Sequence, residues 1–357
     1  MTICILFGGR SGEHEVSLRS AASVVRNLDA SRFEVIGIGI DKAGRWLLQE
    51  TLQISAQPGQ DDVLAIAASA QPVFVVPGDG IHTPSGRLDI DCVFPVLHGT
   101  YGEDGTVQGL LECAGLPYVG AGVAGSAISM DKEMTKRLWR DAGLPVVEFE
   151  MVTRASTEEA RQAALTRLGL PVFVKPCAAG SSLGATRVSD ATGLEAALES
   201  ALQYDTRALV ERFVDAREIE CAVVGNSRPR AFAPGEIVTS AAHGFYDYDA
   251  KYTDPDGARL VTKADLDEAT RSQVQRTAER AYAAVRCEGM ARVDFFVERG
   301  TGKVLLNEIN TIPGFTSISM FPRMCEASGL PYPRLLETLI DLAVARNAER
   351  GTVRFEK

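Results

Sequence analysis

Acidic and amide side chains face one another on two neighbouring segments near the end of the chain. Arg292 and Asp294 share one face of a predicted strand, and so do Glu308 and Asn310 on the strand that follows. If the turn between them centres on residues 300–301, Asp294 lies directly opposite Glu308. Opposed carboxylates weaken a strand pair unless a cation compensates, and Asp, Glu and Asn oxygens are typical Mg²⁺ ligands. A solvated hairpin whose acids pair with neighbouring basic residues explains the pattern equally well.

A lysine and a glycine-rich loop follow another predicted strand, residues 172–174. Lys175 ends this strand, and the next residues include Gly180, Ser181 and Ser182. A positive charge beside exposed backbone N–H groups is a common way to hold phosphates. The loop lacks the GxxxxGK[ST] spacing, and an ordinary turn between two elements has the same composition.

An acidic residue lies where a predicted strand, residues 208–214, enters the next part of the chain. The carboxylate of Glu211 and the extended backbone at Val214 match the acceptors and donors on the edge of an adenine ring. The end of a surface strand has the same appearance. The chain contains, in this order, a lysine, a second lysine with a glycine loop, an acidic hinge and the acidic hairpin. Four unrelated motifs would rarely occur in this order by chance.

The first third of the chain supplies the elements of a parallel sheet. Residues 3–7, 33–40 and 91–97 are predicted strands, and an apolar stripe that includes Leu18 and Val25 predicts a helix between the first two. The third strand ends in the polar loop 98–105. Functional loops of such sheets lie at the carboxyl ends of the strands. We therefore predict a doubly wound, Rossmann-like α/β domain over residues 1–130.

Two smaller α+β lobes are predicted to follow, over residues 131–214 and 215–357. Within the second we expect strands at 218–224 and 230–238, helices at 265–286 and 334–346, and the acidic hairpin. The segment 241–260 is polar and interrupted by glycine and proline, and its length is typical of a surface loop. Its tyrosines favour a lid that closes over a site.

Composition limits the partners of the protein. The 357 residues carry a net charge of −10, which argues against a nucleic-acid or anionic-membrane surface. No long apolar segment or signal peptide is recognised, so we expect a cytoplasmic protein. Its seven cysteines are scattered without a CxxC pair, which predicts reduced thiols rather than disulfides or a zinc site.

The motifs in combination resemble one family across essentially the whole chain. They are residues 8–17 (GGRSGEHEVS), 98–105 (HGTYGEDG), 130–132 (MDK), the Lys175 loop, 246–252 (YDYDAKY) and 307–316 (NEINTIPGFT). At these residues the chain resembles the D-alanine–D-alanine ligase family of the ATP-grasp superfamily. The resemblance implies three domains, ATP between the central and C-terminal lobes, two Mg²⁺ or Mn²⁺ ions, D-alanine as substrate, a role in peptidoglycan precursor synthesis, and a homodimer.

The resemblance also implies roles at the nucleotide. Lys132 and Lys175 would contact ATP phosphates, Glu211 and the backbone of Val214 the adenine, and Glu218 the ribose. The metal ligands would be Asp294, Glu308 and Asn310. Further ATP-site residues would be Ser182, Tyr246 and Lys251. The positive charges would neutralise the transferring γ-phosphoryl group, after which an acyl phosphate of D-alanine forms.

For the amino-acid substrates, the resemblance places Glu15 and His98 near the first D-alanine. Glu15, Ser181 and Tyr252 would be linked by hydrogen bonds. Arg292 and the Gly314 N–H would stabilise the tetrahedral oxyanion, and Ser319 and Met320 would bind the carboxylate of the second D-alanine. Judged singly, Glu15 also fits a helix cap, His98 an ordinary loop histidine, and Ser319 and Met320 a helix start.

Three other functions remain as alternatives. Ligases of the same superfamily join D-lactate or D-serine as the second substrate, although Tyr252 favours the dipeptide because the related D-lactate ligases lack this tyrosine. A non-catalytic nucleotide sensor would keep the lysines but lose the hairpin acids or the lid, and both are present here. A dinucleotide dehydrogenase would need GxGxxG, which residues 8–12 do not match.

Overall fold

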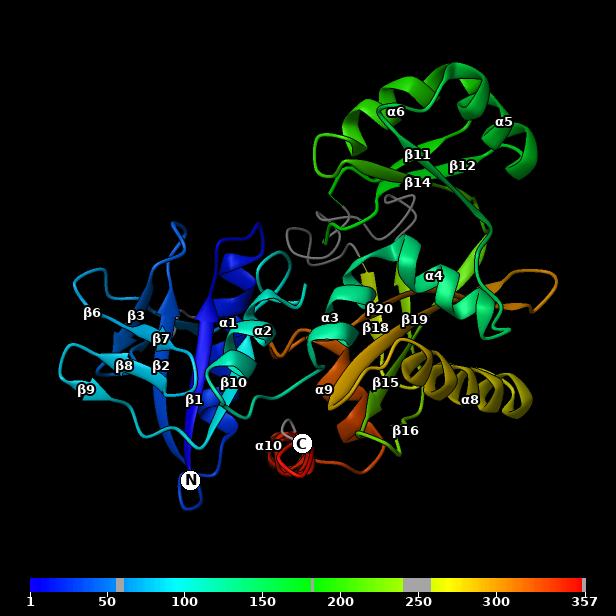
Figure 1. Cartoon of the computed structure of the whole chain (residues 1–357). Coiled ribbons are helices and arrows are strands. Elements are labelled where there is room, and N and C mark those ends of the chain that lie inside the picture. The colour runs from blue at the N-terminus through cyan, green and yellow to red at the C-terminus, as the bar shows by residue number, and fades with distance from the viewer. Residues whose placement is uncertain (56–60, 181–182, 240–257, 355–357) are drawn as a thin grey trace.

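The computed structural model describes residues 1–55, 61–180, 183–239 and 258–354. Three larger sheets organise these residues, and each has its own helices (Figure 1). The central sheet and its helices lie above the C-terminal sheet, and the N-terminal sheet lies to one side of both. None of the helices in this part of the chain combines the length and apolarity needed to cross a bilayer.

The N-terminal sheet has the strand order β10-β1-β2-β3-β6, in which β10, β1 and β2 are parallel and β3 and β6 pair antiparallel. Alternate residues of β1 point to opposite faces, so Ile3 and Ile5 pack with α1, whereas Cys4 and Leu6 pack with α2. Helices on both faces confirm the predicted doubly wound arrangement. The elements are β1 (Thr2–Gly8), α1 (His14–Asn27), β2 (Glu34–Ile40), β3 (Trp46–Gln49), β4 (Ile54–Ser55), β5 (Val63–Leu64), β6 (Gln71–Pro72), β7 (Phe74–Val76), β8 (Gly80–Thr83), β9 (Gly86–Arg87), β10 (Cys92–Val96) and α2 (Thr106–Cys113).

The central sheet is antiparallel, in the order β11-β14-β12-β13. Asp131 begins α4 as a true N-cap, since its side chain accepts a hydrogen bond from the backbone N–H of Met134. Thr157 caps α5 in the same way, by accepting the backbone N–H of Ala160. The elements of this sheet and its helices are β11 (Phe149–Thr153), α5 (Glu158–Leu168), β12 (Val172–Pro176), β13 (Thr186–Val188), η1 (Ala191–Gly193), α6 (Leu194–Ala201) and β14 (Arg207–Arg212). The two helices before them, α3 (Val123–Met130) and α4 (Lys132–Asp141), lie beside the C-terminal sheet instead (Figure 1).

The C-terminal sheet contains the acidic hairpin, β19 and β20, beside the long strand β15. The predicted register is confirmed: Asp294 lies opposite Glu308, and a register shift follows directly after Asp294. The elements are β15 (Ala216–Val224), β16 (Arg230–Ala231), β17 (Gly235–Thr239), β18 (Ala258–Val261), α8 (Glu268–Ala284), β19 (Met290–Glu298), β20 (Val304–Asn310), α9 (Met320–Ala327) and α10 (Tyr332–Arg350).

Two predictions for this region are corrected. The single strand predicted at 230–238 is two strands, because Pro234 lies between β16 and β17 and has no N–H to donate. Residues 258–260 of the predicted lid belong to β18, which pairs with β17. The rest of that segment, residues 241–257, lies outside the described residues.

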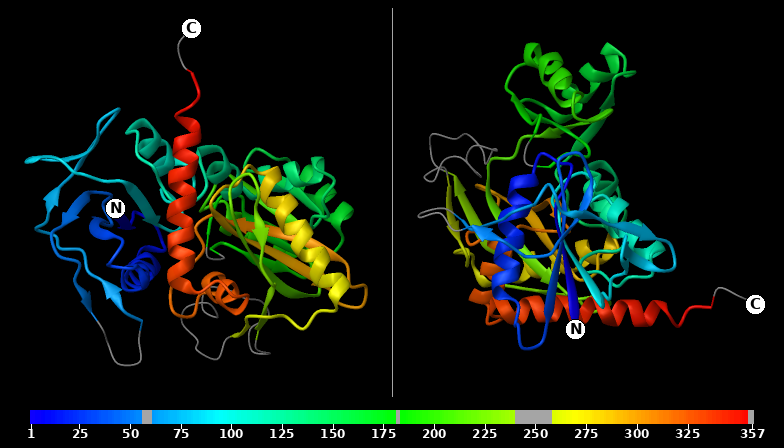
Figure 2. Two further views of the ribbon diagram at one scale, coloured as in Figure 1. Left: turned by 90° about the horizontal axis from the view of Figure 1, so that it is seen from below. Right: turned by 90° about the vertical axis from the view of Figure 1, so that its left-hand side faces the viewer.

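The last helix, α10, packs against the N-terminal sheet. Leu335 and Leu339 of α10 belong to the same buried cluster as Ile3 and Ile5 of β1. Figure 2 shows α10 running between the N-terminal sheet and the rest of the molecule. The C-terminal end of the chain thus helps to fix the N-terminal domain.

Candidate active site

A cavity of about 510 Å³ lies where the three larger sheets meet. Most of the predicted site residues line it: Lys132, Lys175, Glu211, Val214, Glu218, His98, Arg292, Asp294, Glu308, Asn310, Gly314, Ser319 and Met320. Ser181, Ser182, Tyr246, Lys251 and Tyr252 lie outside the described residues. Only Glu15, among the described candidates, is not part of the cavity wall.

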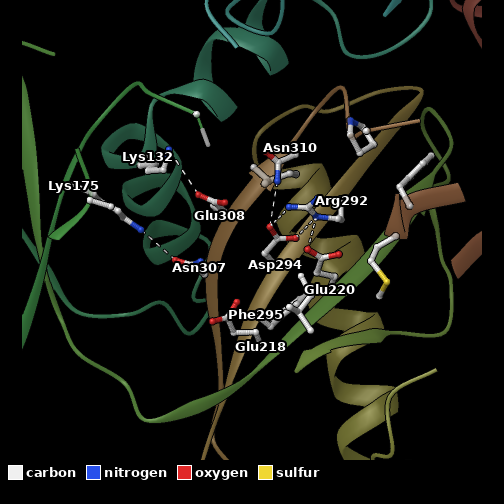
Figure 3. A pocket seen from close by; sticks show the side chains of 18 of the residues that line it. Lys132, Lys175, Glu218, Glu220, Arg292, Asp294, Phe295, Asn307, Glu308 and Asn310 are labelled. Atoms are coloured by element: carbon white, nitrogen blue, oxygen red, sulfur yellow. Dashed lines mark hydrogen bonds and ion pairs between the residues drawn. The ribbon is translucent and has the colours of Figure 1, made fainter. Parts of the chain in front are cut away.

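The hairpin brings basic and acidic side chains together at the floor of the cavity (Figure 3). Arg292 donates two hydrogen bonds of 2.7 Å to the carboxylate of Asp294, and its Nε lies 3.1 Å from Glu220. Asn310 donates to the same carboxylate at 3.2 Å. Burial disfavours the charge of Arg292, but Asp294 and Glu220 raise its pKa well above the ordinary value. Arg292 therefore remains charged and can face a developing oxyanion.

Two lysines approach this hairpin from the other side of the cavity. Lys132, at the start of α4, donates to the carbonyl of Ala179 at 2.7 Å and lies 3.7 Å from Glu308. Lys175 is the next-to-last residue of β12, with its Nζ 2.8 Å from Glu211 and 3.3 Å from the side-chain oxygen of Asn307. Two positive charges thus lie between the glycine-rich loop after Lys175 and the acidic hairpin, where a triphosphate would need them.

A third lysine, Lys136, forms an ion pair that sequence reasoning did not assign. It is fully buried one turn after Lys132, with its Nζ 3.0 Å from Glu211 Oε1, although the two atoms lack hydrogen-bond geometry. Burial lowers the pKa of Lys136 to about 8. Burial alone would raise the pKa of Glu211, but Lys136 and Lys175 lower it. The i, i+4 spacing from Lys132 was the only available signal.

Of the two acids in the motif at residues 8–17, Glu13 faces the cavity and Glu15 does not. Glu15 lies in the first turn of α1, has a side chain 55% exposed, and pairs with Lys42 at 2.5 Å. Glu13 precedes the helix and lines the cavity. Its carboxylate lies so near the glycine-rich loop after Lys175 that a Cβ added to Gly180 would be 2.8 Å from Glu13 Oε2. The sequence motif contains both acids. Their side chains point in different directions because Glu13 precedes α1, whereas Glu15 lies within its first turn.

His98 is buried at the end of β10 and is fixed on both ring nitrogens. Nδ1 lies 3.0 Å from the carbonyl of Ile312, and Nε2 lies 3.1 Å from the hydroxyl of Ser20. Burial opposes protonation, but the carboxylates of Glu103, 3.6 Å away, and Glu13 raise the pKa of His98 above its ordinary value. The alternative of an ordinary loop histidine does not fit these contacts.

The loop between β20 and α9 closes the remaining side of the cavity. Ser319 occupies the N-cap position of α9 without capping it; instead its Oγ accepts the backbone N–H of Thr316 at 3.0 Å. A Cβ on Gly314 would lie 2.7 Å from the same Oγ. Only glycine fits here unless Ser319 moves, so the Gly314 N–H and Ser319 are held side by side.

Comparisons with known proteins identify the family of the chain. The family profile described as D-ala D-ala ligase N-terminus matches residues 2–121, and the one described as D-ala D-ala ligase C-terminus matches residues 138–341. The chain belongs to the D-alanine–D-alanine ligase family. Within this family it is 49% identical to "D-alanine--D-alanine ligase A" of Bradyrhizobium diazoefficiens, over 98% of this chain and 97% of that protein.

Two solved structures share the architecture. The D-alanine-D-alanine ligase from Coxiella burnetii superposes with a TM-score of 0.84 at 42% identity, and covers 98% of this chain and 97% of its own. The VanG D-Ala:D-Ser ligase from Enterococcus faecalis gives a TM-score of 0.83 at 35% identity, over 96% of this chain and 99% of its own. The family member described here therefore has the ATP-grasp fold.

Proposed function

We propose that the protein joins two molecules of D-alanine into D-alanyl-D-alanine, with conversion of ATP to ADP and phosphate, for peptidoglycan precursor synthesis. The observation that carries this proposal is the single cavity described above. It unites two lysines, an acidic hairpin, Arg292 and His98 from three sheets in a chain of this family. A nucleotide sensor would not need Arg292 beside the hairpin acids.

ATP fits between the central and C-terminal sheets. Lys132 and Lys175 would hold the phosphates, and Glu211 and Val214 would face the adenine, with Glu218 at the ribose. Ser182, Tyr246 and Lys251 remain proposed residues of the ATP site. Lys175 now bonds both Glu211 and Asn307, so phosphate binding would exchange these contacts for phosphate oxygens.

The hairpin also fits a divalent cation. Asp294 and Glu308 are opposed like charges, balanced here by Arg292 and Lys132. Among the described residues, no three His, Cys, Asp or Glu side chains form a complete metal cluster. Asp294, Glu308 and Asn310 suit Mg²⁺ or Mn²⁺, which takes few protein ligands beside phosphate oxygens. When bound, the ions would neutralise charge on the transferring phosphoryl group.

The chemistry follows from which groups face one another. The carboxylate of the first D-alanine attacks the γ-phosphorus, the bond to the β-phosphate oxygen breaks, and an acyl phosphate forms. The amine of the second D-alanine then attacks this carbonyl, loses a proton, and phosphate leaves. Arg292 and the Gly314 N–H would face the oxyanion of that step. Glu13, in place of Glu15, and His98 would hold the first D-alanine; Ser181 and Tyr252 remain proposed partners of that acid.

The second substrate would bind beside Ser319 and Met320 at the start of α9, where the Met320 N–H and the Ser319 hydroxyl reach a carboxylate. D-serine or D-lactate remains an alternative acceptor, and the similarity to a D-Ala:D-Ser ligase supports testing it. Competition of D-alanine, D-serine and D-lactate at neutral pH, with products resolved by mass spectrometry, separates these possibilities.

The test of the proposed function is D-alanine-dependent phosphate release together with formation of the dipeptide. Phosphate release without dipeptide would contradict it. Residues 1–130, 131–214 and 215–357, with a lid within 241–257, remain our proposed domains. A homodimer, measurable by light scattering, and a cytoplasmic location, where ATP is supplied, complete the proposal.

A further inference from the structure

One buried hydroxyl on α1 contacts groups from two sides of the cavity. Ser20 is fully buried, and its Oγ lies 3.1 Å from His98 Nε2. The same oxygen accepts the backbone N–H of Phe315 at 3.2 Å. His98 follows β10 of the N-terminal sheet, whereas Phe315 adjoins Gly314 in the loop after β20. Ser20 therefore connects the histidine to the loop that carries the oxyanion N–H.

The hydrogen-bond directions in this network can be assigned. The carbonyl of Ile312 can only accept, so Nδ1 of His98 carries a proton and donates to it at 3.0 Å. In neutral His98, Nε2 is then an acceptor, and the hydroxyl of Ser20 donates to it. The lone pairs of that hydroxyl remain free to accept the Phe315 N–H. Every buried polar group in the network is satisfied when His98 is neutral.

The charged groups around His98 favour its protonated ring instead. Glu103, from the loop after β10, and Glu13, before α1, favour the protonated ring, and Arg292 acts on Glu103 from the hairpin. A protonated His98 would have to donate from Nε2 to Ser20, whose own proton would have to turn elsewhere. Ser20 thus stabilises the neutral ring against its acidic neighbours.

A second serine of α1 holds the other polar group of Phe315. The hydroxyl of Tyr332 donates to the Phe315 carbonyl at 3.1 Å and lies 3.2 Å from Ser23 Oγ. Because the tyrosine proton is used on the carbonyl, Ser23 donates to the tyrosine oxygen. The N–H and the C=O of Phe315 are therefore both held from one helix, and Tyr332 also stacks on the Phe315 ring.

We propose that Ser20 is a positioning residue that orients the ring of His98 through its Nε2 and, through the amide of Phe315, holds the Gly314 N–H against the reacting carboxyl group. This inference rests on the proposed function. It makes α1 of the N-terminal domain a part of the oxyanion site of the C-terminal lobe. The positions of His98, beside the first substrate, and of the Gly314 N–H are then coupled through Ser20.

The test uses Ser20→Ala, with Ser17→Ala as the matched control. Ser17 is also fully buried on α1, but its hydroxyl bonds the Gly8 N–H at 2.8 Å and the Val96 carbonyl. NMR of the substrate-free protein, with His98 assigned from His98→Gln, follows the ring titration. In Ser20→Ala the midpoint should rise by about one pH unit, because the donor to neutral Nε2 is lost. In Ser17→Ala it should stay at the wild-type value.

Steady-state kinetics supply the second readout. In Ser20→Ala, kcat should fall about ten- to a hundredfold through misplacement of Gly314, with the KM for ATP little changed. Tyr332→Phe removes the hold on the Phe315 carbonyl and should lower kcat without moving the His98 titration. Equal responses of Ser17→Ala and Ser20→Ala, or an unshifted His98 in Ser20→Ala, would overturn the proposal. The titration needs no substrate, so a failure of dipeptide synthesis would not be confused with it.

Discussion

Glu13 and Glu15 lie two positions apart, and only Glu13 faces the cavity. We predict that Glu13→Gln lowers kcat/KM for D-alanine about a hundredfold, because a charged partner of the substrate ammonium group is lost. Glu15→Gln removes only an exposed ion pair with Lys42 and should leave kcat/KM within about twofold. Initial rates at varied D-alanine measure both. The reverse ranking would restore the assignment to Glu15.

Lys136 predicts a pH dependence of nucleotide affinity. When ADP phosphates draw Lys175 away from Glu211, the buried carboxylate of Glu211 keeps only Lys136 as its cationic partner. The ADP complex therefore favours protonated Lys136. Its pKa of about 8 in the free protein would therefore rise on binding. ADP affinity should be constant below pH 8 and fall about three- to tenfold by pH 9.5.

Calorimetric titration of Mg-ADP across this range measures the effect. Lys136→Arg keeps its charge at every pH used, and should remove the alkaline loss of affinity. Lys136→Met should bind weakly at all pH values. An identical alkaline loss in wild type and Lys136→Arg would assign the titration to another group.

At the scale of elements, the acidic hairpin is the part of the site most open to test. Glu308→Gln removes one of two opposed carboxylates, so we expect at least a hundredfold loss of kcat with the free energy of unfolding changed by less than about 1 kcal/mol. Asp294→Asn should lose activity similarly. Denaturant unfolding and dipeptide formation at varied Mg²⁺ measure the two effects.

Glu298→Gln is the control on the same hairpin. Glu298 lies at the far end of β19, pairs with Arg212 at 3.0 Å, and does not line the cavity. It should retain wild-type turnover. Full activity of Glu308→Gln would argue against a metal at the hairpin.

The hairpin also shows what sequence reasoning can recover. Its register was predictable because strand residues alternate with period two and one turn connects the strands, so a single assumption fixed the Asp294–Glu308 pair. The prediction of Glu15 depends on where a helix begins, and in the structure Glu13, not Glu15, lines the cavity. The i, i+4 spacing placed Lys136 on the same helix face as Lys132, but its ion pair with Glu211 could not be predicted, since that burial is decided by segments about 75 residues apart. The interruption at Pro234 follows from proline's missing N–H, which the sequence does show.

At the scale of the whole molecule, the three sheets must be held at fixed distances for one cavity to form. The docking of α10 on the N-terminal sheet could not be read from the sequence, because periodicity identifies an apolar face but not the surface it covers. Arg346 of α10 is buried where these parts meet, and it donates to the carbonyls of Tyr118, at 2.7 Å, and Gly120. Its guanidinium also lies 4.5 Å from the Tyr118 ring.

Arg346→Met should therefore loosen the N-terminal domain from the C-terminal lobe. Because two buried carbonyls lose a charged donor, we expect the free energy of unfolding to fall by about 3 kcal/mol or more. The unfolding midpoint should be lower, and a separate early transition should appear. Arg350→Met, on the same helix but 45% exposed and paired with Glu112, should cost less than about 1 kcal/mol. Calorimetry of both variants, with and without ATP analogue and D-alanine, measures this. Because ligands bind only the assembled cavity, they should merge the two transitions of Arg346→Met into one; unchanged unfolding of that variant would show that α10 does not hold the domains together.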